Sequence, residues 1–364
     1  MGVEVVGTLF VIFVVYAMLW WWWYESMFEY VSFETAMSLS WIIIICPLIA
    51  LTLLVHPQLE SDGVIPCRSF LEIENDKLEL DKNFLRVMQF NTLAETNATQ
   101  ESFPFVNKKY LAWSHRFPMI ISEITDTMPD VVCLQEVYNM NEFNNKLKEY
   151  GYAGVHAMKE HGREGPAIFY LKDKFLNYEE DVKVHVLKLD EKTFGIFLAL
   201  KLKFPLPGVD QTVNIVCAHL KAKEEFENYR KLQAEELHCF MTRFYQCNTP
   251  SQIKGTLIIA ADANCEIDSP ANIILRKDLH SAYTDVFNNE TGKEKDKFVT
   301  TSKNRTESGL VKREIDFIFY DPRHLAISGV QQMPEGILSS LTNGLPSQNY
   351  PSDHVALCAE FRFI

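Results

Sequence analysis

Polar side chains that can bind cations or move protons stand at the ends of several short apolar segments. In chain order these are Asn91 after 84–90, Glu136 after 131–134, His219 after 213–217, and Asp262 with Asn264 after 257–261. Asp316 lies inside the apolar segment 315–320, and Asp353 and His354 precede the last such segment. Polar groups repeated at strand ends are what an active site at a sheet edge requires.

Taken singly, these residues also have ordinary structural explanations. Asn91 and Asn264 could be turn formers or helix caps, and His219 could be a hydrogen-bonded core residue. Glu136 fits such roles less well, because Glu favours neither strands nor turns. Asp316, between two large apolar residues, would be costly to bury without a partner. The sequence therefore indicates chemistry most strongly at Glu136 and Asp316.

The segments that would position these residues read as short buried strands that alternate with helices. The predicted strands are 84–90, 131–134, 167–170, 197–200, 213–217, 257–261, 315–320 and the alternating tail 355–363. A helix is predicted over 226–246, with one apolar face formed by Phe226, Tyr229, Leu232, Leu237, Phe240 and Phe244. Another is predicted over 113–128, kinked at Pro118. This alternation indicates an α/β domain with a two-sided core.

The order of the motifs resembles the endonuclease/exonuclease/phosphatase superfamily, which has the DNase-I-like fold. The resemblance runs from Leu85 to Phe363. It implies an α/β sandwich of four layers, in which two packed mixed sheets are flanked by helices. Within the superfamily the chain is similar to the nocturnin family, in the deadenylase-related branch. The stretches that carry this similarity are 85–94, 129–137, 219–222 and, most specifically, 345–354.

The resemblance implies a metal-dependent phosphoric ester hydrolase. Glu136 and Asn91 would hold Mg²⁺, with Mn²⁺ as a substitute, because hard oxygen ligands suit a cation that serves a phosphate substrate. His354 would accept a proton from the attacking water. No phosphoenzyme is needed, since the metal polarises the phosphate that water attacks.

The resemblance also implies supporting roles for the other polar residues. Asp353 or Asp316 would orient the imidazoles and stabilise their cationic forms. Asp262 would position the attacking water. Asn264 and His219 would donate hydrogen bonds to the phosphoryl oxygens.

Basic residues other than the predicted catalytic and metal-binding residues indicate which substrate is bound. In the nocturnin family such residues bind the phosphates of a dinucleotide, and the reaction removes the 2′-phosphate from NADP⁺ or NADPH. The matching positions here are Lys159, Lys221, Lys223 and Arg305, with Asn264 beside the same phosphate. Lys223 stands where the family has Arg, which keeps the charge but loses the two-pronged guanidinium.

Three other functions remain open. A poly(A)-specific 3′–5′ exoribonuclease, or deadenylase, could use the same residues on an RNA 3′ end. Net charge counts against this, because a chain at −13 binds polyanions poorly, and no leucine-rich adaptor repeat is present. The remaining alternatives are a membrane lipid phosphodiesterase and a non-catalytic membrane adaptor.

The eight Cys residues show no metal-binding spacing, which is typical of buried free thiols in a reducing compartment.

The first 57 residues read as a membrane anchor, followed by a linker over 58–82 and a catalytic domain over 83–364. No Lys or Arg occurs before residue 67, and the apolar runs 5–24 and 39–55 are each close to the length of a membrane span. They predict a helical hairpin of two transmembrane helices in contact with membrane lipid. A single anchor or a signal peptide are the alternatives.

The charges flanking these runs predict their orientation. Bases follow the second run, at Arg68, Lys77, Lys82 and Arg86, so positive-inside reasoning places the catalytic domain in the cytosol. The endoplasmic reticulum and the outer mitochondrial membrane are candidate locations. Three glycosylation sequons, at Asn97, Asn289 and Asn304, would suggest the opposite side, but about two are expected by chance.

Overall fold

The computed structural model describes residues 68–72, 84–159, 164–176, 182–205, 212–246, 255–291, 298–304, 309–340 and 343–364. The chain divides into two units, and all of these residues belong to the second, Gly63–Ile364. Both predicted membrane segments and most of the predicted linker lie outside the described residues. Within the described part, no helix combines the length and the apolar character needed to cross a bilayer.

A seven-stranded mixed sheet forms one half of the core. Its strand order is β1-β14-β15-β2-β3-β5-β4, and β2 and β3 are its parallel neighbours. The strands span Phe70–Glu72 (β1), Leu325–Gln331 (β14), Leu357–Phe363 (β15), Phe84–Asn91 (β2), Val131–Val137 (β3), Gly165–Leu171 (β5) and Tyr152–His156 (β4).

A six-stranded mixed sheet forms the other half, in the order β10-β13-β9-β8-β7-β6. Here β8 and β9 are the parallel neighbours. The strands span His280–Ser281 (β10), Asp316–Tyr320 (β13), Thr256–Asp262 (β9), Thr212–His219 (β8), Lys192–Lys201 (β7) and Lys183–Leu189 (β6). Each sheet thus has one parallel pair at or near its centre, and these two pairs carry Asn91, Glu136, His219 and Asp262.

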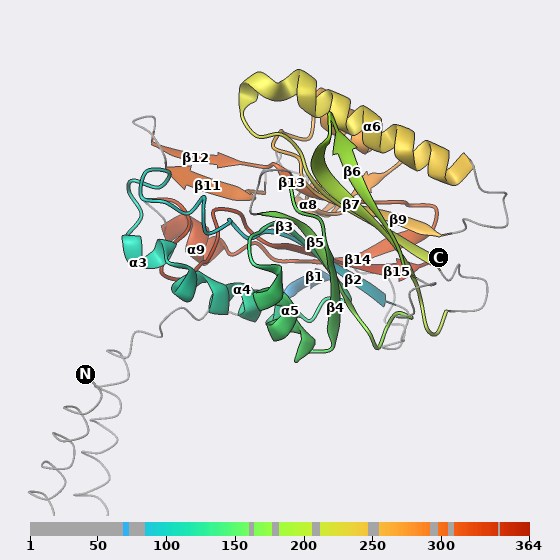
Figure 1. The fold of residues 1–364 in the computed structure, drawn as a ribbon, viewed down its shortest axis with the longest axis horizontal. Coiled ribbons are helices and arrows are strands. Elements are labelled where there is room, and N and C mark those ends of the chain that lie inside the picture. Colours follow the sequence, from blue (N-terminus) through green and yellow to red (C-terminus); the bar gives the residue numbers. More distant parts are fainter. Residues whose placement is uncertain are drawn as a thin grey trace, which may run out of the picture. The chain divides into compact units, whose positions relative to one another are not determined.

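The two sheets pack face to face, because successive side chains of a strand point to opposite faces. Val87 of β2 packs in one apolar cluster with Ile215 of β8, whereas Met88 packs in another with Ile120 of helix α4 (Trp113–Thr127). In Figure 1, α4 and α5 lie beside the first sheet and the long helix α6 lies beside the second. The predicted α/β fold with two packed mixed sheets is therefore confirmed.

The remaining elements connect these layers. The helices are α3 (Lys108–Leu111), α5 (Met140–Lys148), η1 (Glu224–Phe226), α6 (Glu227–Gln246), α7 (Pro270–Leu275), α8 (Ala282–Thr291) and α9 (Glu335–Ser340). Two short strands, β11 (Thr301–Asn304) and β12 (Leu310–Arg313), form a separate antiparallel ribbon. This ribbon matters for the site described below.

The predicted apolar face of the long helix needs one correction. Leu232 is 50 % exposed on α6, whereas Leu237 is buried. The buried side instead includes Arg230 and Gln233, whose polar ends bond to the loop after β8. The apolar periodicity therefore predicted the wrong residue for burial at this point of α6. Arg230 and Gln233 are buried in place of Leu232, because their side chains bond to the loop after β8.

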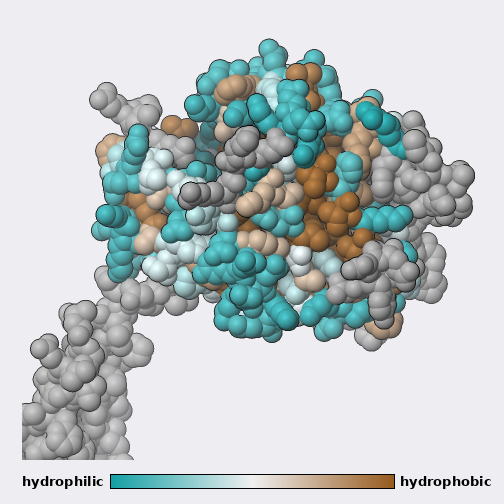
Figure 2. Space-filling view, in the orientation of Figure 1, coloured by the Kyte–Doolittle hydropathy of each residue, from teal (hydrophilic) through white to brown (hydrophobic). Residues whose placement is uncertain are grey.

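Strand β6 lies at the edge of its sheet and was not predicted. Lys183, Val184, His185 and Val186 are all exposed. Polar residues interrupt the apolar ones along this strand, so no continuous apolar run marks it in the sequence. Figure 2 shows hydrophobic surface gathered in the region of β6 and β7.

Candidate active site

The carboxyl ends of the central strands bring the predicted residues to one edge of the two sheets. Asn91 ends β2 and lies beside Gln135 of β3. His219 ends β8 and lies beside Asp262 of β9. Because β2 packs against β9, Asn91 reaches across from one sheet to the other, and its Nδ2 donates to Asp262 Oδ2 at 2.8 Å.

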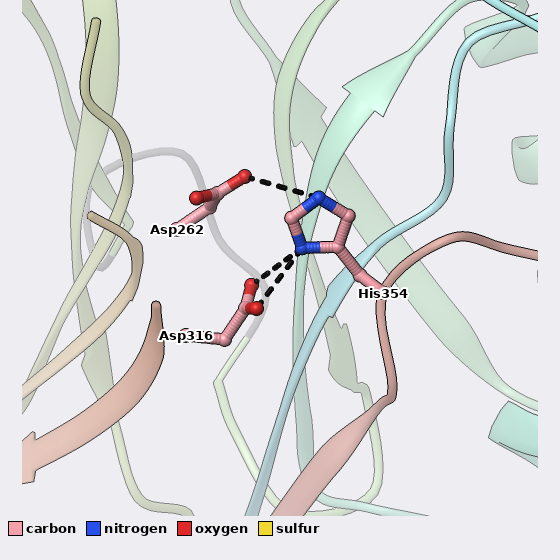
Figure 3. A group of neighbouring side chains, drawn as sticks. All are labelled: Asp262, Asp316 and His354. Atoms are coloured by element: carbon pink, nitrogen blue, oxygen red, sulfur yellow. Dashed lines mark hydrogen bonds and ion pairs between the residues drawn. The ribbon is translucent and has the colours of Figure 1, made fainter. Parts of the chain in front are cut away.

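Three buried side chains form the centre of the site (Figure 3). Asp316 begins β13 and lies directly opposite Asp262, while His354 approaches both from the segment before β15. Nδ1 of His354 lies 3.1 and 2.9 Å from the two carboxylate oxygens of Asp316, and Nε2 lies 3.7 Å from Asp262 Oδ2. Gln89 donates a further bond of 2.9 Å to Asp316. The buried Asp316 carboxylate thus has the partners that burial requires.

The charges around His354 favour its protonated form. Burial alone would lower the pKa of this imidazole, but Asp316, Asp262 and Asp353 outweigh burial and the opposing charge of Lys303, and they raise the pKa to about 9. Burial raises the pKa of Asp262 to about 6, with Asp316 adding to the rise. At neutral pH a cationic imidazole therefore lies beside an anionic carboxylate. This pKa does not favour His354 acting alone as the proton acceptor, the role predicted from the sequence.

Of the two acidic residues predicted to orient the imidazoles, Asp316 bonds to Nδ1 of His354. The carboxylate of Asp353 has Oδ2 2.9 Å from Nζ of Lys303. The same ammonium lies 3.1 Å from Nε2 of His354. Lys303 was not predicted as a site residue, because it belongs to the polar strand β11. The nearby basic residue that was predicted to bind substrate is Arg305, two positions later.

His219 is held as a neutral donor. Its Nδ1 lies 3.2 Å from Nζ of Lys159, and its Nε2 lies 3.6 Å from Asp262 Oδ2. Burial, followed by the charges of Lys159 and His354, places the pKa of this imidazole well below its usual value. Since an ammonium can only donate, Nδ1 must accept and the single ring hydrogen must be on Nε2. His219 is thus in the tautomer that can donate a hydrogen bond into the site.

Glu136 lies at the open side of the site and suits a divalent cation. Its Oε2 accepts from the Ala94 amide at 3.0 Å and from Asn97 Nδ2 at 2.7 Å, while Oε1 accepts only from Asn91 Nδ2 at 3.2 Å. Among the described residues, no Lys or Arg nitrogen lies within 4.0 Å of this carboxylate. Oε1 therefore keeps acceptor capacity for a hard cation that retains several waters.

Asn91 has a different orientation from the one its predicted role requires. Its side-chain oxygen accepts from the Leu93 amide at 3.0 Å, and its nitrogen faces the carboxylates of Glu136 and Asp262. Asn91 therefore holds the two carboxylates in place, and a ligand role would require its amide to turn over.

A second group of possible ligands, Asp262, Asp316 and His354, lies with its donor atoms within 4.8 Å of one another. A cation there would have to displace the hydrogen bonds between Asp316 and His354. It would also meet an imidazole that favours its protonated form, which cannot bind a metal. The donor chemistry therefore fits a cation better at Glu136 than within this buried group.

The predicted substrate residues do not all contact this centre. Lys159 does, through His219, and it is held in place by Glu164 at 2.9 Å. Lys221 and Lys223 are exposed in the loop after β8, and the Lys221 ammonium lies 4.9 Å above the Phe226 ring. Arg305 lies outside the described residues.

Asn264 has a positive φ of 52° and fastens two loops of the site. Its Nδ2 donates to the Leu220 carbonyl at 3.0 Å, and its backbone amide donates to Asp262 Oδ1 at 3.1 Å. The side chain therefore joins the loop after β9 to the loop after β8, whereas the backbone amide fixes Asp262 at the end of β9. The predicted contact of Asn264 with phosphate remains a prediction.

Arg116 is a fully buried basic residue that sequence reasoning missed. Its guanidinium donates to the carbonyls of Leu111, Thr92 and Pro351 at 3.0–3.2 Å, so it joins helix α4 to the segments after Asn91 and before His354. Burial lowers its pKa to about 10, although the nearby charges of Asp353 and Glu136 act against this. The available signal was a basic residue within the apolar stripe that runs from Trp113 through Ile120.

Comparison with known proteins agrees with this geometry. Nocturnin from Homo sapiens is 30 % identical over 298 residues, which cover 77 % of this chain and 65 % of that protein. The exoribonuclease subunit Ccr4 of the CCR4-Not complex from Debaryomyces hansenii is 25 % identical, over 84 % of this chain and 42 % of that protein. This chain thus spans less than two thirds of either relative. No protein-family model matches it.

A solved structure supports the same relationship. The human nocturnin catalytic domain with bound sulfate superposes with a TM-score of 0.60 at 26 % sequence identity, covering 82 % of this chain and 99 % of that domain. Together with the relatives, this confirms the predicted resemblance to the nocturnin family.

Proposed function

From the similarity to nocturnin in sequence and structure, we propose that the chain is a member of the endonuclease/exonuclease/phosphatase superfamily and that it removes the 2′-phosphate of NADP⁺ or NADPH. The reaction is hydrolysis, in which water forms a bond to phosphorus and the bond to the ribose 2′-oxygen breaks. The products are inorganic phosphate and NAD⁺ or NADH.

The observation that carries this proposal is the position of Lys159. Its ammonium lies 3.2 Å from Nδ1 of His219, whose Nε2 lies 3.6 Å from Asp262 Oδ2. A terminal phosphate monoester carries close to two negative charges at neutral pH, whereas each RNA diester carries one. A cation fixed beside the catalytic imidazole therefore favours the monoester.

The side chains of the centre divide the work of hydrolysis. Nε2 of His219, which carries hydrogen, donates to a phosphoryl oxygen. Asp262 Oδ2 lies 3.6 Å from Nε2 of His219 and 3.7 Å from Nε2 of His354. The proton of the attacking water passes to the Asp262–His354 pair. Asp316 holds the His354 ring in the required orientation and stabilises its charge.

We propose Mg²⁺ as the cation, held by Glu136. When bound, it supplies Lewis-acid stabilisation of the charge that develops on the phosphate. Asn91 and Asn97 keep the Glu136 carboxylate in position through the hydrogen bonds described above.

A poly(A)-specific 3′–5′ exoribonuclease is the second candidate, favoured by the similarity to Ccr4. The same centre could act on an RNA phosphodiester. The net charge of −13 opposes this, because RNA binding depends on neutralising many phosphates. The membrane lipid phosphodiesterase and the non-catalytic adaptor have no support among the relatives. The membrane anchor and the cytosolic orientation remain proposals, since they concern residues outside the described part.

The test is to incubate the purified full chain with Mg²⁺ and, in parallel reactions, with NADP⁺, NADPH and a 5′-labelled poly(A) oligonucleotide. Phosphate release from the dinucleotides with intact RNA is expected. The Glu136→Gln variant should release none. Shortened RNA without phosphate release would instead establish the exoribonuclease.

A further inference from the structure

The ribbon β11–β12 carries one side chain into the centre of the site from outside both sheets. Figure 1 shows the ribbon projecting beside the sheets, and Lys303 is the third residue of β11. None of the roles assigned above requires this residue. Its position is nevertheless closely fixed.

Backbone hydrogen bonds join β11 to the segment that carries His354. The Val355 amide donates to the Thr300 carbonyl at 2.7 Å, and the Leu345 amide donates to the Ser302 carbonyl at 2.7 Å. Thr301 pairs with His354, and Lys303 pairs with Gly344. The strand is thus bonded to β12 along one edge and to the His354 segment along the other.

Gly344 shows how tightly these segments meet. Its φ is +78°, and a Cβ atom there would lie 2.9 Å from both the Asn304 nitrogen and the Ser302 oxygen. No other residue fits without moving the ribbon. The close approach explains why the side chain of Lys303 reaches His354.

The ammonium of Lys303 lies beside the reacting side of His354. Nζ is 3.1 Å from Nε2 of His354 and 2.9 Å from Asp353 Oδ2. An ammonium has three hydrogens and no acceptor. When the His354 ring is neutral at Nε2, the ammonium donates to it, as that of Lys159 does to His219, and a further ammonium hydrogen can contact an anion. When His354 is protonated, Nε2 also carries hydrogen, and an anion that contacts both donors is favoured.

We propose that Lys303 is a catalytic residue that contacts a phosphoryl oxygen of the substrate together with Nε2 of His354. This rests on the proposed function, in which a phosphate monoester is hydrolysed at this centre. Asp353 holds the ammonium in place. Lys303 and Lys159 then flank the phosphate from opposite sides, one beside each imidazole, and the charge that grows on the phosphoryl oxygens in the transition state is stabilised from both.

The test compares three variants of the full chain: Lys303→Met, Lys303→Arg and Lys312→Met. Lys312 is the matched control, because it lies on the partner strand of the same ribbon and its ammonium donates to the Leu338 carbonyl, away from the centre. Thermal unfolding of each variant reports whether the ribbon keeps its place.

Two measurements are made on each protein in Mg²⁺. Isothermal titration with inorganic phosphate reports binding without requiring turnover, and steady-state kinetics with NADPH report kcat and KM. Lys303→Met should weaken phosphate binding about tenfold and lower kcat about a hundredfold. Lys303→Arg should recover most of both, and Lys312→Met should stay within twofold of the wild type.

The two readouts separate the proposal from the function on which it rests. If no phosphoester is turned over but phosphate binding still depends on Lys303, the proposed function fails and the anion contact stands. If Lys303→Met and the wild type bind phosphate with equal affinity, the contact is disproved. It is also disproved if neither protein binds phosphate. A loss shared by all three variants, or one that follows a fall in the unfolding temperature, would show that Lys303 only supports the ribbon.

Discussion

Asp262 and Asp316 face each other directly across the antiparallel strands β9 and β13. Two like charges in such positions destabilise a sheet. His354 offsets this, because its two ring nitrogens contact one carboxylate each. The imidazole is therefore both part of the reacting centre and the group that makes the acidic pair tolerable.

Replacing Asp316 should show how far catalysis depends on the carboxylate that orients His354. Asp316→Asn removes the charge that holds Nδ1 of His354 and should lower kcat at least about a hundredfold. Asp321→Asn is the control, since Asp321 follows the same strand and pairs with the exposed Arg323. Single-turnover kinetics of both variants would check this, and a kcat for Asp316→Asn within threefold of wild type would contradict the orienting role.

Metal removal should stop turnover, and Glu136 should account for the affinity. Chelation of the full chain should abolish phosphate release, and Mg²⁺ or Mn²⁺ should restore it. Glu136→Gln should weaken Mn²⁺ binding about a hundredfold, measured by the electron paramagnetic resonance of free Mn²⁺. Glu149→Gln, at an exposed ion pair with Lys146 at the C-terminal end of α5, should bind as the wild type does. Equal affinities for all three proteins would move the cation to another set of ligands.

Lys159 should discriminate between the two candidate substrates. Lys159→Met removes the cation beside His219 and should raise KM for NADPH about tenfold. It should change cleavage of a poly(A) oligonucleotide less, because each diester carries a smaller charge. The exposed Lys148→Met serves as the control for net charge. An equal loss on both substrates would mean that Lys159 acts through the His219 tautomer alone.

Arg116 should be essential for stability. Arg116→Met leaves three backbone carbonyls without their donor and should lower the free energy of unfolding by about 3 kcal/mol. Urea unfolding followed by tryptophan fluorescence measures this. Arg323→Met, at a side chain that is 70 % exposed, should change the free energy by less than about 0.5 kcal/mol. A small effect of Arg116→Met would show that water replaces the guanidinium.

The stability of the metal-free chain should fall as pH rises above neutrality. The pKa of His354 is about 9 in the folded chain and about 6.5 in the unfolded chain. The folded state therefore binds this proton more tightly, and the resulting stabilisation, on the order of 3 kcal/mol, is complete below about pH 6.5 and lost by about pH 9. Urea titrations at pH 6 and pH 9.5 should show the fall. His354→Gln should flatten it, and an unchanged slope in that variant would assign the pH dependence to other groups.

The buried strands could be predicted because both of their faces are covered. The segments 131–134 and 257–261 became β3 (Val131–Val137) and β9 (Thr256–Asp262), since a strand between two layers is apolar throughout. Strands β11 and β12 could not be predicted in this way. Their residues are mostly polar, and they pair because other parts of the chain lie next to them.

The choice between neighbouring acidic residues also required three dimensions. Asp353 and His354 are adjacent in the sequence, yet the carboxylate that lies 2.9 Å from Nδ1 of this imidazole is that of Asp316, thirty-eight positions away. Adjacent side chains of an extended segment point in opposite directions. Residue types therefore predicted the membership of the site, whereas the pairing of its members depended on the packing of the two sheets.

The position of Asn97 bears on which side of a membrane the active site can function. Its Nδ2 donates to Glu136 at 2.7 Å, and the same nitrogen is where an oligosaccharide would be attached in the sequon Asn97-Ala98-Thr99. A sugar linked there would stand against the carboxylate that we assign to the cation. In a chain that was glycosylated at Asn97, the sugar would therefore block cation binding at Glu136. Only a chain without this modification could be active.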